Sequence, residues 1–269
     1  MNLENITLDI NELCSNAASY IRQQMKLLRA HDIELKDEHN FVTYVDRKSE
    51  EMLVEGLMPL LPSAGFLAEE GKYGAADTEY KWIIDPLDGT TNFIHGIPFF
   101  CISIALVNTK ETVAGVVYEI NRNECFYTWK GGKALLNGRE IRVSDAAMLK
   151  DSLLVTGFPY SRDHILDEYM DLFKGFIQRT QDLRRLGSAS ADLAFVAAGR
   201  FEGFYEYGLN PWDVAAGAFL VKQAGGNVTD FEGGDNYIFG GSLVSSNHHI
   251  HGEMLEVIRR YFLTKTNHI

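Results

Sequence analysis

The second half of the chain alternates between short apolar segments and longer amphipathic ones, and this pattern restricts the fold more than any other feature. Beyond about Ser144, segments typical of strands and of helices follow one another at 153–156, 164–178, 183–186, 190–198, 201–207, 211–224, 243–246 and 250–262. Strands that alternate with helices build a sheet that is covered by helices. We therefore predict an α/β half over residues 146–269.

The first half of the chain has a different sequence pattern. Two amphipathic segments at 7–31 and 46–61 are typical of helices. Residues 99–143 are rich in β-branched and aromatic side chains, and Asn137-Gly138 is a typical two-residue hairpin turn. This pattern predicts an α+β half over residues 1–145 with an antiparallel meander. Because no flexible linker separates the two halves, we expect them to form one compact unit.

The chain is acidic. Its 269 residues include 37 Asp and Glu against 25 Lys and Arg, so the formal net charge is −12. A surface of this charge repels the phosphates of DNA and RNA, and we expect no nucleic-acid partner. The same charge disfavours a phosphorylated substrate, unless bound cations convert part of the acidic surface into an anion site.

Cysteine and hydropathy patterns indicate a reducing compartment. The three cysteines, Cys14, Cys101 and Cys125, form no Cys-x-x-Cys pair, which argues against a disulfide framework or a zinc site. We expect three buried, reduced thiols. The sequence shows no signal peptide at its start and no apolar run that approaches the ~20 residues of a membrane span. A cytoplasmic protein without a membrane partner is therefore expected.

The segment from Trp82 to Phe93 has the strongest chemical pattern. An apolar strand at 80–84 leads into Asp85, and we expect Pro86 to end its hydrogen-bonded ladder. Asp88 follows, and Gly89-Thr90 can begin a short helix whose first amides are free to bind phosphate. Carboxylate and carbonyl oxygens on such a turn suit Mg²⁺, Mn²⁺ or Ca²⁺.

Two other interpretations of this segment remain open. An Asp-rich turn that only caps a helix would need no ligand. A phosphatase that forms an aspartyl-phosphate would use Asp-x-Asp, whereas Asp85 and Asp88 are separated by two residues. The longer spacing counts against a covalent intermediate.

Two more acidic segments favour the metal interpretation. Glu69 and Glu70 come at the end of an apolar strand, where the alternative is an exposed acidic turn. Asp213 lies in the first turn of a helix that Asn210 and Pro211 begin, where the alternative is an interaction with the helix dipole. In contrast, we expect the pair Arg184-Arg185 to be solvated or to lie in an interface.

Together these segments resemble the inositol monophosphatase family. The resemblance rests on Glu-Glu at 69–70, Asp-Pro-Leu-Asp-Gly-Thr-Thr-Asn-Phe at 85–93 and Trp-Asp-Val-Ala-Ala-Gly at 212–217, and it extends from Lys36 through Ser246. It implies a layered αβαβα sandwich of the sugar-phosphatase type. It also implies a lithium-sensitive phosphatase that uses two or three Mg²⁺ ions, with Mn²⁺ as an alternative, and that forms a homodimer.

The resemblance also implies a role for individual residues. The metal ligands would be Glu69, Asp85, the Leu87 carbonyl, Asp88 and Asp213. The residues that orient the attacking water would be Glu69, Thr90 and Asp46. The residues that bind the phosphate and the rest of the substrate would be Gly89, Thr90, Gly187, Ser188, Ala189, Glu206 and Lys36. Ala68 and Ser188 depart from the commoner Gly and Thr of the family, and neither departure removes a ligand side chain.

The expected reaction is hydrolysis of a small phosphate monoester, either inositol monophosphate or a similar polyol phosphate, by a metal-activated water. Fructose-1,6-bisphosphatase, histidinol phosphatase and adenosine 3′,5′-bisphosphate phosphatase activities remain open, because one scaffold hosts several substrates. A protein of another class, a metal-binding regulator without catalysis, is the remaining alternative. It would be favoured by loss of a ligand, and all the ligand side chains are present.

Overall fold

The first layer of the molecule consists of two helices, α1 (Leu3–Met25) and α2 (Tyr44–Leu57). The computed structural model describes residues 1–27, 33–37, 40–71, 78–159 and 165–264. Asn2 caps α1, and Thr43 with Asp46 forms a capping box that begins α2. Each helix buries one apolar stripe, as the spacing predicts, but both begin a few residues earlier than expected.

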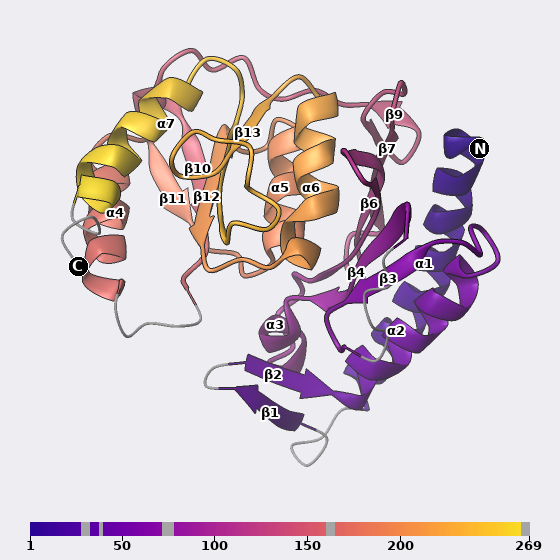
Figure 1. The fold of residues 1–269 in the computed structure, drawn as a ribbon. Helices are drawn as coiled ribbons and strands as arrows, with labels where there is room; N and C mark the ends of the chain where they lie inside the picture. Colours follow the sequence, from indigo (N-terminus) through magenta and orange to yellow (C-terminus); the bar gives the residue numbers. More distant parts are fainter. Residues whose placement is uncertain (28–32, 38–39, 72–77, 160–164, 265–269) are drawn as a thin grey trace.

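A seven-stranded sheet packs against these helices (Figure 1). Its strands lie in the order β3 (Gly65–Ala68), β4 (Tyr80–Asp88), β5 (Cys101–Asn108), β6 (Thr112–Glu119), β7 (Glu124–Trp129), β8 (Leu135–Leu136) and β9 (Arg139–Glu140). β3 is parallel to β4, and every later pair is antiparallel. Asn137 (φ 47°) and Gly138 (φ 81°) make the predicted turn between β8 and β9.

The middle layer consists of α5 (Ala189–Ala197) and α6 (Pro211–Gln223). All nine residues of α5 are buried, because the helix lies between two sheets. A Cβ atom at Gly115 on β6 would lie 3.1 Å from the Ala216 carbonyl oxygen of α6. Glycine therefore permits a close approach of this helix to the sheet.

A second sheet of five strands covers the other side of the middle layer. Its strands lie in the order β11 (Asp182–Arg184), β10 (Leu153–Thr156), β12 (Gly203–Tyr207), β14 (Ser242–Ser246) and β13 (Asn227–Thr229). β11, β10 and β12 are parallel, whereas β14 is antiparallel to both β12 and β13. The sheet is thus mixed, and β13 was not predicted.

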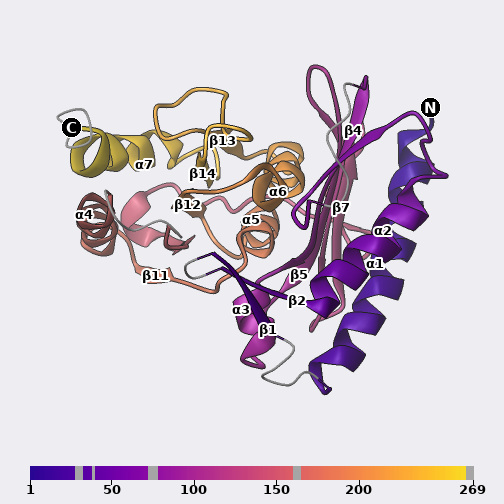
Figure 2. The same cartoon turned by 60° about the horizontal axis from the view of Figure 1, so that its bottom comes forward.

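The last layer contains α4 (Leu166–Ile177) and α7 (His251–Ile258), and a π-helical turn (Arg259–Leu263) follows α7. Figures 1 and 2 show five layers, from α1 and α2 through the two sheets and the helices between them to α4 and α7. This arrangement confirms the predicted αβαβα sandwich. The division of the chain after residue 145 remains a prediction.

A small hairpin outside the main sheets was not predicted. It consists of β1 (Ile33–Asp37) and β2 (Asn40–Thr43), and it lies beside the short helix α3 (Thr90–Ile94) in both views. Cys14, Cys101 and Cys125 are buried and free, as expected. No helix in the described ranges is both long and apolar enough to cross a bilayer.

Candidate functional site

Strand β4 does not end at Pro86, and the sequence prediction was wrong on this point. Asp85 pairs with Ser103 and Asp88 pairs with Cys101, so β4 has one residue more than β5 between these pairs. Such a bulge is a place where a sheet tolerates proline, which has no N–H for the ladder. Because the extra residue shifts the alternation of side chains, Asp85 and Asp88 lie on the same face of the sheet.

Asp85 lies in the middle of a cluster of acidic groups. Its side chain is buried, and one carboxylate oxygen accepts a hydrogen bond of 3.0 Å from the Leu87 amide. Burial raises the pKa of the Asp85 carboxyl well above its usual value, and the negative charges of Glu69, Asp88 and Asp213 raise it further. The fold therefore brings together four carboxylates from three distant segments.

Asp88 is tied to the loop that precedes α5. Its Oδ2 atom accepts hydrogen bonds from the Ser190 amide (2.7 Å) and the Ser188 hydroxyl (3.0 Å). The Cys101 thiol lies 3.3 Å from the same hydroxyl oxygen. Desolvation raises the pKa of Asp88, and these hydrogen bonds lower it. The loop thus fixes the position of a predicted metal ligand.

Asp213 begins α6 at the edge of the same cluster. Its Oδ2 atom accepts a hydrogen bond of 2.7 Å from the Asn210 amide, which completes a capping box. The Ser190 hydroxyl donates to the Asp213 carbonyl at 2.8 Å. Desolvation raises the pKa of Asp213 well above its usual value, followed by the charge of Asp88. Asp213 therefore caps a helix and also belongs to the acidic cluster, so one role does not exclude the other.

Asp46 and Thr90 form the pair that the family resemblance implies. The Thr90 hydroxyl lies 2.9 Å from Oδ1 of Asp46 and 3.0 Å from the Leu87 carbonyl oxygen. The other oxygen of Asp46, which is buried, accepts hydrogen bonds from the amide (2.8 Å) and the hydroxyl (2.6 Å) of Thr43. The capping box of α2 thus orients Asp46 toward Thr90.

Gly89 and Gly187 allow two loops to meet at the start of α3. Both have left-handed backbones, with φ values of 99° and 95°. A Cβ atom at Gly89 would lie 3.1 Å from the Phe99 carbonyl oxygen and 3.2 Å from that of Gly187. The Asn92 amide group donates to the Phe99 and Leu186 carbonyls, each at 2.8 Å. Only glycine fits this junction without strain.

A narrow cleft extends from the acidic cluster toward the second sheet. Its lining includes predicted residues from both halves of the chain, namely Asp88, Gly187, Ser188, Ala189, Glu206 and Asp213. Burial raises the pKa of the Glu206 carboxyl to about 8, the positive charge of Arg185 lowers it, and Asp88 raises it. Glu206 packs so closely against Gly157 that a side chain there would overlap its carboxylate.

Sequence reasoning missed two charged residues of this cleft. Arg185 is exposed, as expected, but it lines the cleft, whereas its neighbour Arg184 pairs with Asp182. Asp192, in the first turn of α5, also lines the cleft and is almost completely buried. The sequence signal for Asp192 is a charged residue in an otherwise apolar helical segment.

Glu69 belongs to the acidic cluster, and Glu70 follows it in the chain just after β3. The Glu69 amide donates to the Ile84 carbonyl at 3.2 Å, and the Glu70 amide donates to the Glu50 carboxylate at 2.9 Å. The first bond holds Glu69 beside β4, and the second holds Glu70 against α2. Lys36 belongs to β1, and its side chain lies outside the described part of the structure.

The donor set fits a hard divalent cation. Carboxylates and one backbone carbonyl are the ligands that Mg²⁺ prefers, and their mutual repulsion would be relieved by a bound cation. As they stand, however, no three His, Cys, Asp or Glu side chains in the described ranges meet closely enough to form a cation site. The hydrogen bonds to Asp85, Asp88 and Asp213 show which protein groups occupy their oxygens instead.

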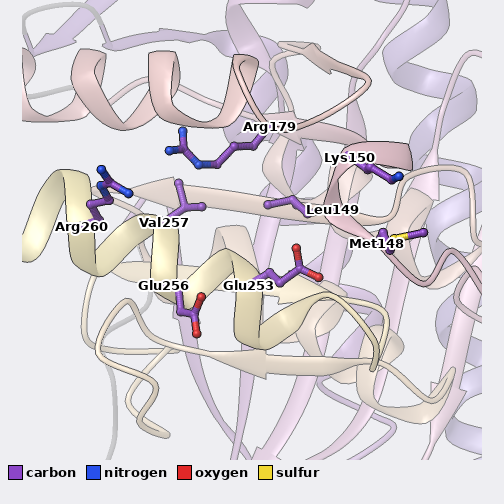
Figure 3. Close-up of a pocket in the computed structure, with 8 residues that line it drawn as sticks. All are labelled: Met148, Leu149, Lys150, Arg179, Glu253, Glu256, Val257 and Arg260. Atoms are coloured by element: carbon purple, nitrogen blue, oxygen red, sulfur yellow. The ribbon is translucent and has the colours of Figure 1, made fainter.

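A larger hollow than this cleft lies elsewhere. A cavity of about 480 Å³ lies between α7, the end of α4 and the short helix at Leu149–Asp151 (Figure 3). Its lining includes Met148, Arg179, Glu253 and Arg260 but none of the predicted site residues. Cavity volume alone therefore does not identify the candidate active site, which we place at the acidic cluster.

Comparisons with known proteins agree with this assignment. An inositol-1-monophosphatase of Rhizobium meliloti is 44% identical over 229 residues, which covers 85% of this chain and 86% of the relative. A Nus factor SuhB of Pseudomonas aeruginosa is 42% identical over 237 residues, with coverages of 86% and 88%. The solved inositol monophosphatase of Anabaena has a TM-score of 0.87 and 37% identity, and the match covers 97% of this chain and 98% of that structure.

The family-level match is nearly complete and supports a phosphatase function. It extends over residues 2–262, from the cap of α1 to the turn after α7, and includes both halves of the acidic cluster. This chain belongs to the inositol monophosphatase family.

Proposed function

We propose that the protein is a Mg²⁺-dependent phosphomonoesterase that hydrolyses inositol monophosphate or a similar polyol phosphate. The observation that carries this proposal is the gathering of Asp85, Asp88 and Asp213 beside the Asp46–Thr90 pair. Buried like charges that raise one another's pKa values are costly for a fold, and they are typical of functional sites. A purely structural role explains the capping by Asp213 but not the cluster.

The metal would be held by oxygen atoms alone. Its ligands would be Glu69, Asp85, the Leu87 carbonyl, Asp88 and Asp213. When bound, Mg²⁺ supplies positive charge that neutralises the phosphate and lowers the pKa of a coordinated water. The protein's own contribution is to hold these oxygens at one end of the cleft, through the bulge of β4 and the loop before α5.

The Asp46–Thr90 pair would orient the attacking water. A hydroxyl that donates its proton to Asp46 keeps a lone pair that can accept a hydrogen bond from water. The carboxylate of Asp46 is itself fixed by Thr43, so the direction of this lone pair is set before substrate binds. Together with Glu69, the pair would hold the water in line with the leaving alcohol, and no covalent intermediate is required.

The substrate would lie along the cleft, with its phosphate at the start of α3. The amides of Gly89 and Thr90 would donate to phosphate oxygens, since the first amides of a helix have no partner within it. The alcohol would contact Gly187, Ser188, Ala189 and Glu206. Lys36, on β1, is proposed as a further contact to the phosphate.

A phosphate-release assay tests the function. The panel consists of inositol 1-phosphate, fructose 1,6-bisphosphate, histidinol phosphate and adenosine 3′,5′-bisphosphate, each with Mg²⁺, with Mn²⁺ and with a chelator. We expect cation-dependent release from inositol 1-phosphate and inhibition by lithium. Release that persists in the chelator, or trapping of the enzyme by beryllofluoride, would contradict a metal-activated water. We also propose a homodimer, which sedimentation equilibrium tests.

A second candidate function comes from the relatives that are named Nus factor SuhB. The chain could share that role, independently of catalysis. The test is complementation of a strain that lacks such a relative, with wild type and with Asp85→Asn. Equal rescue by the two would support a role that needs no phosphatase activity, and failure of both would count against it.

A further inference from the structure

The alcohol end of the cleft contains a buried acceptor that no protein group satisfies. Asp192 is 1% exposed, and its Oδ1 atom has no hydrogen-bond partner. An unsatisfied buried acceptor is costly, by an amount comparable to a lost hydrogen bond. Because Asp192 lines the cleft, a ligand in the cleft is a source of the missing donor.

The same cleft also contains a cationic side chain, Arg185. Burial raises the pKa of Asp192 well above its usual value and that of Glu206 to about 8, and the positive charge of Arg185 partly offsets both shifts. Its guanidinium lies 5.7 Å from the centre of the Phe158 ring and packs against Gly187. Among the described residues, Arg185 has no ion pair within 4.0 Å and no hydrogen-bond acceptor, unlike Arg184. Within the described ranges, therefore, no protein acceptor takes up its donors.

The polar groups of the cleft restrict the ligand. A guanidinium and an unsatisfied carboxyl oxygen in one cleft offer donors and an acceptor. A hydroxyl group satisfies both at once, because it donates one hydrogen bond and accepts others. An ammonium group would be repelled by Arg185. A fully ionised second phosphate has no proton to donate to the unsatisfied Oδ1 atom of Asp192. Neighbouring uncharged hydroxyls fit this arrangement best.

We infer that Asp192 and Arg185 bind a vicinal diol of the leaving alcohol, with a hydroxyl donating to Asp192 and an oxygen of the same diol accepting from Arg185. This inference rests on the proposed function and adds two substrate-binding residues to the predicted set. It assigns them to selectivity for the alcohol rather than to the hydrolytic step. Replacement of either residue should therefore change the relative kcat/KM values of different phosphate esters.

The test compares two esters that differ only in hydroxyl groups, inositol 1-phosphate and cyclohexyl phosphate. For each variant we compare kcat/KM for the first ester with that for the second. We expect Asp192→Asn and Arg185→Gln each to lower this ratio about tenfold or more, as expected for loss of a charge-assisted hydrogen bond. The double variant should lose less than the product of the two effects, since both residues bind one diol.

Matched control variants distinguish a loss of selectivity between the two esters from a general loss of activity or stability. Arg184→Gln removes the neighbouring guanidinium, which pairs with Asp182, and Glu119→Gln changes a fully buried acid on β6. Neither control should alter the ratio. If Asp192→Asn does not fold, as judged by circular dichroism, Arg185→Gln decides the question alone.

Each other outcome has a distinct meaning. If the ratio stays within twofold in both variants while both esters are hydrolysed, the inference is wrong although the proposed function stands. If Arg185→Gln instead lowers both rates equally and changes the mass in sedimentation, Arg185 is an interface residue and the inference fails. If wild type hydrolyses neither ester, the proposed function itself has failed.

Discussion

The Thr90 hydroxyl lies 2.9 Å from Oδ1 of Asp46, and this contact joins two segments that are 44 residues apart in the chain. It connects the start of α2 to the start of α3, where the phosphate is proposed to bind. The same hydroxyl is 3.0 Å from the carbonyl of Leu87, a proposed metal ligand. A single oxygen atom therefore touches both the proposed water-orienting group and the proposed metal site.

Removal of this hydroxyl should reduce turnover while the fold is retained. Thr90→Val keeps the shape of the side chain, and we expect kcat to fall about 100-fold, within the range that a positioned proton acceptor contributes. Thr90→Ser restores the oxygen and should recover most of kcat. Steady-state kinetics with saturating Mg²⁺ checks both variants. A valine variant with kcat within threefold of wild type would contradict the assigned role.

Neutralising the centre of the acidic cluster should abolish turnover and stabilise the metal-free protein. The pKa of Asp85 is raised by burial and by three neighbouring carboxylates, so its charge disfavours the folded state. We therefore expect Asp85→Asn to raise the free energy of unfolding in chelator. Urea titration measures this change.

A matched aspartate serves as the control for that stability effect. Asp182 is exposed, and a hydrogen bond from Arg184 lowers its pKa, so Asp182→Asn should not stabilise the protein. Asp213→Asn should also abolish turnover, with the helix cap retained by the amide oxygen. Substantial Mg²⁺-dependent activity in either site variant would remove the basis of the proposed metal site.

Glu206 should make the stability of the protein depend on pH. Its pKa is raised from 4.5 to about 8, mainly by burial. Between these values the unfolded chain has released a proton that the folded protein keeps, so stability falls as pH rises from 4.5 to 8 and then levels off. Glu206→Gln removes this part of the slope. Urea titrations of both proteins from pH 4.5 to 9 measure it, and parallel curves would show that the carboxyl ionises normally.

Ser188 should support the metal ligand Asp88. Its hydroxyl donates to Oδ2 of Asp88 at 3.0 Å, and groups that orient ligands typically change metal affinity 10- to 100-fold when removed. We expect Ser188→Ala to increase the Mg²⁺ concentration for half-maximal activity about tenfold, with a smaller effect on kcat. Ser152→Ala, which removes a buried hydroxyl that donates to the Met148 carbonyl, is the control. Equal Mg²⁺ dependence of the two variants would contradict this role.

Local patterns predicted most of the elements, because each one depends on neighbouring residues. The helix α6 was predicted from Asn210 and Pro211 at its start. It has no amphipathic pattern that would indicate a helix, because Val214–Val221 are all buried. The bulge in β4 could not be predicted, since it exists only through pairing with β5, and Pro86 by itself indicates the end of a strand. The hairpin of β1 and β2 has no Asn-Gly or Asp-Gly signal between its strands.

The site likewise contains residues that a local motif marks and residues that only contacts between distant segments bring in. Motif residues such as Asp85, Asp88 and Asp213 were identified from the sequence because each follows a recognisable strand end or helix start. Arg185 and Asp192 carry no such signal. They reach the cleft because the start of α5 is bonded to Asp88, a contact between residues far apart in the chain.

Gly157 offers a test of the alcohol end of the cleft that removes no charged or polar side chain. A Cβ atom there would overlap the Glu206 carboxylate, and no left-handed backbone requires glycine at this position. Gly157→Ala should therefore displace Glu206 and raise KM for inositol 1-phosphate, with less effect on cyclohexyl phosphate. Gly252→Ala on α7 is the control, because its Cβ would meet no atom within 4 Å and alanine favours a helix. Since Glu206 touches the alcohol only in the proposed orientation of the substrate, an equal effect of Gly157→Ala on both esters would place the alcohol elsewhere.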